Sequence, residues 1–128
     1  MIFYRRKYSR FHVSRRYCRT LKKLEDGCRQ VSDLQQAGQI ITAEKMYNRK
    51  LCYYYGECRH LLKSRAEELE ANEPETGVAE LDRIRSVFLA FYALAEGYNV
   101  DISAQKDDAL RILDELTEVF RRKTEPEA

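Results

Sequence analysis

The sequence predicts an all-α fold: an antiparallel bundle of about four helices, arranged as two helical hairpins, with a basic N-terminal arm. Apolar residues recur at steps of three and four, which is the spacing of one helix face. Charged residues make up 34% of the chain, which suits long solvated helices. Proline occurs only at Pro74 and Pro126, so nothing breaks a helix before Pro74. We expect one domain in 128 residues, with the arm at 1–13, the bundle at 14–123 and a polar tail at 124–128.

Two long helices are predicted before Pro74. The first covers about 14–37, and its apolar face consists of Tyr17, Leu21, Leu24, Cys28, Val31 and Leu34. Gly38 is its expected end, because glycine readily adopts the left-handed conformation that follows many helices. The second helix begins near Thr42. Its predicted face consists of Met46 or Tyr47, Leu51, Tyr54, Cys58, Leu61, Arg65 or Ala66, and Leu69.

Two shorter helices are predicted after the linker "ANEPETG". The third covers about 78–96, and its inward face consists of Leu81, Ile84, Phe88, Phe91 and Leu94 or Ala95. The fourth runs from Ser103 to about Arg122, with Ile102, Ala109, Leu113, Leu116 and Phe120 on its apolar face. Short connections between such helices are typical of antiparallel bundles.

The turn between the first two helices sets the expected register of the first hairpin. Cys28 and Cys52 lie at equal distances from a turn near Ile40, so we expect them to face each other. Gly27 and Gly56 lie at similar heights, where missing side chains would let the two backbones approach closely.

Charge is distributed very unevenly along the chain. Residues 1–30 carry ten Lys or Arg and two acids, a net charge of +8, and residues 31–65 carry +3. Residues 66–128 carry seven basic and sixteen acidic residues, a net charge of −9, so the whole chain has only +2. Such asymmetry bears on association with partners rather than on fold.

The basic arm has the composition of a nucleic-acid contact. Arginine and lysine are interleaved with aromatic rings, and guanidinium groups pair with phosphates while rings stack on unpaired bases. We expect the contact to be made by Arg5, Arg6, Lys7, Arg10, Arg15, Arg16 and Arg19 together with Tyr4, Tyr8 and Phe11. The pattern favours RNA or a ribonucleoprotein assembly. Alternatively, the arm binds another protein, or it docks on the acidic half of the same chain.

Three consecutive tyrosines, Tyr53 to Tyr55, mark a second candidate surface. They cover about 200° of a helix, so not all of them can be buried. Tyr54 fits the predicted core, which leaves Tyr53 and Tyr55 as candidate protein-binding residues. The alternative function is therefore a protein-binding adaptor or inhibitor. Its acidic helix faces could also imitate the phosphates that a basic groove binds.

The sequence predicts no catalytic residue, no metal site and no cofactor. Glu57 and His60 have the Glu-x-x-His spacing of di-iron bundles, but a complete site needs that motif twice. The four cysteines lack the close spacing of zinc sites and are expected as reduced thiols, which indicates the cytoplasm. The arginine-rich, acid-free start also resembles a mitochondrial transit peptide, so a mitochondrial location is the alternative. No membrane partner is expected, because no apolar stretch is long enough to span a bilayer.

Overall fold

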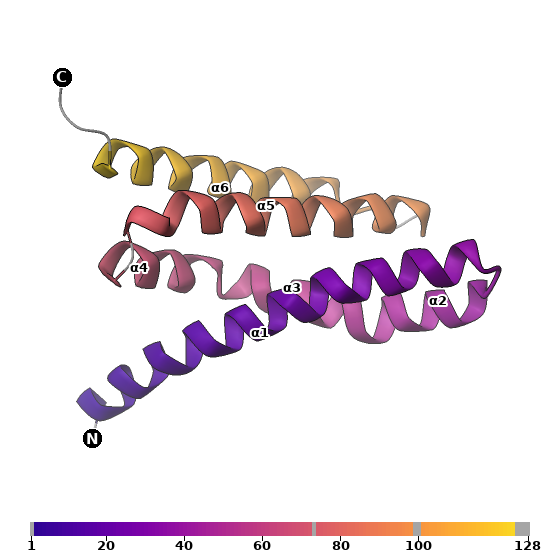
Figure 1. The fold of residues 1–128 in the computed structure, drawn as a ribbon, viewed down its shortest axis with the longest axis horizontal. Helices are drawn as coiled ribbons and strands as arrows, with labels where there is room; N and C mark the ends of the chain where they lie inside the picture. The colour runs from indigo at the N-terminus through magenta and orange to yellow at the C-terminus, as the bar shows by residue number, and fades with distance from the viewer. Residues whose placement is uncertain (1, 73, 99–100, 125–128) are drawn as a thin grey trace.

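The computed structural model describes residues 2–72, 74–98 and 101–124, and the side chains of residues 15–72, 74–98 and 101–123 among them. These residues form helices and connecting turns and contain no strand, which confirms the all-α prediction. The helices lie alongside one another and share one hydrophobic core (Figure 1). Within the described ranges, no helix is both long enough and apolar enough to cross a membrane.

The first helix, α1 (Ile2–Gln36), is much longer than predicted. It begins at Ile2 rather than near Ser14, because neither proline nor glycine occurs before Gly27 to interrupt the helical backbone. The arm is therefore a helical extension of the bundle, and Figure 1 shows its first turns diverging from the other helices. Gly38, with φ +80°, follows the helix as expected.

The second predicted helix is divided into four parts. They are α2 (Ile40–Met46), the π-helical turn η1 (Tyr47–Leu51), α3 (Cys52–His60) and α4 (Leu62–Asn72). Leu61 separates α3 from α4, with φ −93° and ψ 6°. A π turn holds one residue more than an α turn, so the residues that follow it are rotated relative to an uninterrupted α-helix.

That rotation changes which residues of α3 and α4 enter the core. Tyr55 is 4% exposed and Leu62 is 2% exposed, whereas Tyr54 and Leu61 are only partly buried at the core edge. The prediction that placed Tyr54 and Leu61 on the core face was therefore displaced by one residue. The buried face follows steps of four through η1, because the π turn absorbs the extra residue.

The last two helices pack closely against each other. The first of them, α5 (Pro74–Gly97), begins at Pro74 rather than near Val78, because proline is well tolerated at the first position of a helix. The second, α6 (Ser103–Thr124), begins where predicted, and the carboxylate of Asp101 accepts a 3.2 Å hydrogen bond from the backbone N–H of Ser103. A Cβ atom at the buried Gly77 would lie only 2.6 Å from the Phe120 ring, so α5 and α6 meet here without space for a side chain.

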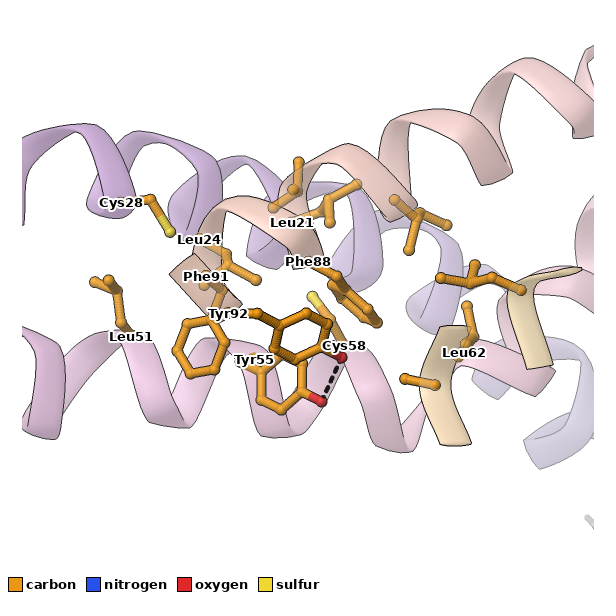
Figure 2. Packing of buried hydrophobic residues seen from close by; sticks show 14 of the residues in the cluster. Leu21, Leu24, Cys28, Leu51, Tyr55, Cys58, Leu62, Phe88, Phe91 and Tyr92 are labelled. Carbon is orange, nitrogen blue, oxygen red and sulfur yellow. Dashed lines mark hydrogen bonds between the residues drawn. The ribbon is translucent and has the colours of Figure 1, made fainter. Parts of the chain in front are cut away.

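The remaining core residues largely match the predicted faces. Those that are fully buried include Tyr17, Leu21, Leu24, Val31, Leu81, Ile84, Phe88, Phe91, Ala95, Ala109, Leu113 and Phe120. Leu34, Leu94, Ile102 and Leu116 pack against this core from its edge. Aromatic rings fill the space between α3 and α5, where the Tyr55 and Tyr92 hydroxyls form a 2.8 Å hydrogen bond and Tyr55 stacks on Phe91 at 4.4 Å (Figure 2).

The first hairpin is tightly packed at one of the two glycines. A Cβ atom at Gly27 would lie 2.7 Å from the Leu51 side chain; this neighbour is a side chain, so the close approach of the two backbones stays a prediction. The same prediction for Gly56 was wrong, because no atom lies within 4 Å of its Cβ position. Cys28 is buried and Cys52 is exposed, and both are free thiols, so the expectation that they face each other stays a prediction.

Candidate nucleic-acid interface

A cleft of about 370 Å³ lies between α1 and α3. Residues 15, 19 and 23 are each four apart, so helix geometry places their basic side chains along one strip of α1. The facing wall is formed by α3, which packs directly on α1. The cleft is lined by Arg15, Arg16, Arg19, Thr20, Lys23, Tyr53, Tyr54 and Glu57.

An ion pair across the cleft holds Arg16 in place. The Arg16 guanidinium pairs with the carboxylate of Glu57, whose side chain is only 12% exposed. The pKa of Arg16 is raised by its hydrogen bond to Glu57, then by the charge of Glu57, and also by a hydrogen bond with Tyr53. Glu57 therefore orients Arg16 toward the wall of the cleft that Tyr53 and Tyr54 form, here called the tyrosine wall.

The tyrosine wall offers one exposed ring and one covered ring. Tyr53 is 61% exposed and contacts Tyr54 edge-on, with 6.1 Å between ring centroids. The ammonium group of Lys23 lies 5.9 Å from the centroid of the Tyr54 ring, which is within the range of a cation–π contact. Tyr54 therefore helps to position Lys23, while the open ring of Tyr53 is free to stack on a flat ligand.

The charge of the cleft suits a polyanion. Its four basic side chains face a single carboxylate, that of Glu57. Among the residues that the structure describes, Arg19 makes no ion pair, so its charge is available to a ligand. A cleft with excess positive charge and an exposed ring can bind a phosphate and an adjacent unpaired base together.

The structure brings together part of the predicted contact. Arg15, Arg16 and Arg19 line the same cleft as Tyr53, although the sequence assigned the arginines and the tyrosine to different surfaces. The backbone of the remaining predicted residues belongs to α1, but their side chains lie outside the described part of the chain; they are Tyr4, Arg5, Arg6, Lys7, Tyr8, Arg10 and Phe11.

Tyr55 requires a correction. It was predicted as a protein-binding surface residue, but its ring is buried and its hydroxyl is hydrogen-bonded to Tyr92. The cause is the π turn η1, which rotates Tyr55 into the core and Tyr54 toward the cleft.

Four residues of the cleft were absent from both predicted surfaces; they are Thr20, Lys23, Tyr54 and Glu57. Lys23 could have been found from its spacing of four from Arg19, whereas Tyr54 required knowledge of the π turn. Glu57 was considered only as part of an incomplete Glu-x-x-His motif with His60. In the structure it pairs with Arg16.

A buried polar cluster supports the opposite side of α1. Arg65 and Glu68 are 6% and 9% exposed and form an ion pair of 3.7 Å, and Arg65 also donates a hydrogen bond of 3.6 Å to the Sγ atom of Cys18. The neighbouring Tyr17 has a pKa raised well above its usual value, mainly by burial. These contacts join α4 to α1 directly behind the arginines of the cleft.

The cysteines are placed as core and surface thiols rather than as a ligand set. Burial raises the pKa of Cys28 and of Cys58 to about 12, so both are protonated at neutral pH. Within the described residues, no three potential metal-binding side chains of His, Cys, Asp or Glu lie close enough together to hold an ion.

Comparison with known proteins identifies no relative. The sequence matches no protein-family model, and neither a curated protein nor a solved structure matches it.

Proposed function

We propose that this chain is a non-catalytic binding protein that acts as an accessory or regulatory component on nucleic acid, with RNA or a ribonucleoprotein assembly as the favoured partner. The observation that carries the proposal is the cleft between α1 and α3, in which Arg15, Arg16 and Arg19 lie beside the exposed ring of Tyr53. The basic N-terminal turns of α1 extend the same positive charge along the helix.

The chemistry of the cleft favours a single strand over a duplex. Arginine and lysine side chains bind phosphates of any sequence, and their contribution falls as salt rises because condensed counterions are released. Tyr53 contributes only if a base is unpaired and can stack on its ring, which a paired duplex does not offer. The proposed ligand is therefore single-stranded RNA, or a loop of a folded RNA.

We also propose that the helices form an antiparallel bundle of about four rods in two hairpins, with α2, η1, α3 and α4 acting as one bent rod. This arrangement supports the cleft by fixing α3 against α1, since the two helices pack directly together. The free cysteines suit a reducing compartment such as the cytoplasm.

The alternative, a protein-binding adaptor, has one observation of its own. Ile40 and Ile41 are 54% and 72% exposed at the tip of the first hairpin, close to the turn at Gly38. Such apolar side chains on a tip suit a protein contact. Phosphate mimicry by α6 has less support, because Asp114 and Glu118 already pair with arginines of this chain.

Binding of a labelled single-stranded oligouridine across a salt series tests the proposal. Replacing Arg19 by Ala removes one phosphate contact, so the slope of log K against log salt should flatten by about 0.7 units for single-stranded RNA. Replacing Tyr53 by Ala removes stacking instead, which should cost about 1–3 kcal/mol without changing the slope.

Lys22→Ala is the matched control. Lys22 lies on the same helix as Arg19 and carries the same charge, but it pairs with Asp26 and lies outside the cleft. It should change affinity much less than Arg19→Ala. Absence of binding at low salt, or an equal effect of Lys22→Ala and Arg19→Ala, would contradict the proposal. Copurified protein partners that survive nuclease treatment would favour the adaptor.

A further inference from the structure

A second concave site lies on the other side of α3, facing α6. Its volume is about 570 Å³, within the range of roughly 300–1,000 Å³ that is typical of small-molecule sites. Its apolar lining includes the partly buried Ile102 and Ile112 and the edges of the buried Tyr47, Tyr55, Leu62 and Phe91. We call this site the α3–α6 groove. It shares no lining residue with the cleft between α1 and α3.

The polar rim of the α3–α6 groove is predominantly basic. Arg59, His60 and Lys63 lie on the wall formed by α3 and α4, and Asp108 on α6 is the one acidic residue of the lining. Asp108 is already engaged, because it accepts a 2.6 Å hydrogen bond from Arg111 and pairs with Arg59 at 3.6 Å. Among the described residues, neither His60 nor Lys63 makes an ion pair. Within the described ranges, the Lys63 ammonium at the rim is therefore not neutralised by a carboxylate.

The shape of the groove favours a small occupant over a helix. The ion pair between Arg59 and Asp108 joins α3 to α6 directly across the groove. A helix with its side chains is about 10 Å wide, and would have to break this pair to enter. The space beside Gly56 is open, because no atom lies within 4 Å of the missing Cβ. A flat or narrow molecule can enter there without moving either helix.

We infer that the α3–α6 groove binds a small amphipathic anion, with its apolar body against the partly buried Ile102 and Ile112 and its carboxylate, sulfonate or phosphate beside Lys63 and His60. The apolar body leaves water for a surface that the fold already provides, which is the main favourable contribution in such sites. The basic rim orients the molecule through a charge-assisted hydrogen bond. This inference does not depend on the binding of nucleic acid.

Fluorescence titration with 8-anilinonaphthalene-1-sulfonate tests both parts of the inference. We expect saturable binding of one dye molecule by the folded protein. Gly56→Leu places a side chain in the open part of the groove, and should weaken dye binding by about tenfold or more because dye and side chain compete for the same space. Near-UV circular dichroism of each variant confirms that the dye reports a native groove rather than a loosened core.

A second pair of measurements isolates the charge. Lys63→Gln should weaken binding of the sulfonate dye by about tenfold, since one charge-assisted contact is lost. It should leave unchanged the binding of N-phenyl-1-naphthylamine, which is a similar dye without the sulfonate. Lys50→Gln, which changes an exposed lysine outside the groove, is the matched control.

Three outcomes would overturn the inference. The first is the absence of saturable dye binding by the native protein. The second is dye affinity that stays the same in a folded Gly56→Leu variant. The third is a Lys63→Gln variant that binds both dyes as the wild type does, which would show that no anion is recognised at the rim.

Discussion

Two helical glycines should respond in opposite directions to the same substitution. In Gly77→Ala the new Cβ atom would lie 2.6 Å from two carbon atoms of the Phe120 ring, whereas carbon atoms in contact lie about 3.5–4.0 Å apart. The ring is 1% exposed and cannot turn into solvent, so the two helices must separate. Overpacking of this kind costs about 1–3 kcal/mol, and the gain in helix propensity returns at most about 1 kcal/mol. We expect a net loss of about 1–2 kcal/mol.

Gly56→Ala is the matched variant, because its new Cβ meets no atom within 4 Å. Only the gain in helix propensity remains, so the free energy of unfolding should rise by about 0.5–1 kcal/mol. The two variants should therefore differ by about 2–3 kcal/mol, or roughly 10 °C in melting temperature for a chain of this size. Calorimetry or thermal circular dichroism measures the difference. An increase in melting temperature for both variants would refute the packing of α5 on α6 at this point.

Three further predictions concern the core. Leu62→Ala should cost about 2–5 kcal/mol and Leu61→Ala clearly less, since Leu62 is 2% exposed and Leu61 is only partly buried; equal costs in urea unfolding would contradict the π turn. Arg65→Ala or Glu68→Ala should each lower the free energy of unfolding by about 3–5 kcal/mol by leaving a buried charge. The double variant Arg65→Met, Glu68→Leu should be far less destabilised, and a double-mutant cycle measures the coupling between the two residues. Burial raises the pKa of Cys58 from 9.0 to about 12, so the unfolded state loses this proton first and stability should fall from about pH 9 toward pH 12. A Cys58→Ala variant whose stability falls as steeply over that range would show that other groups cause the loss.

The helix faces before the π turn could be predicted from spacing alone. Tyr17, Leu21 and Leu24 are buried as expected. A regular α-helix repeats every 3.6 residues, so apolar residues three and four apart lie on the face that packs inward. The end of α1 could also be predicted from the local sequence, because Gly38 adopts a positive φ that is unfavourable for other residues. The start of α1 was missed because a basic composition suggested an arm, whereas nothing in residues 2–13 prevents a helix.

The cleft between α1 and α3 could be predicted only in part. The sequence indicated that Arg15, Arg16 and Arg19 belong to a basic surface, because composition alone shows the charge. It did not indicate that Tyr53 lies beside them, or that Glu57 holds Arg16. Those contacts join residues far apart in the chain, and they depend on the angle at which α3 meets α1.

The sequence by itself determined the all-α class, the inward face of each regular helix and the separation of basic from acidic halves, because each of these follows from composition or from a repeat within one helix. Only the tertiary structure decided the rotation of α3. One extra residue in η1 turns Tyr55 into the core and leaves Tyr53 exposed, and an apolar pattern compatible with both arrangements cannot distinguish them. In this rotation Tyr55 packs against Phe88, Phe91 and Tyr92 of α5, while Tyr53 and Tyr54 line the cleft beside the arginines of α1.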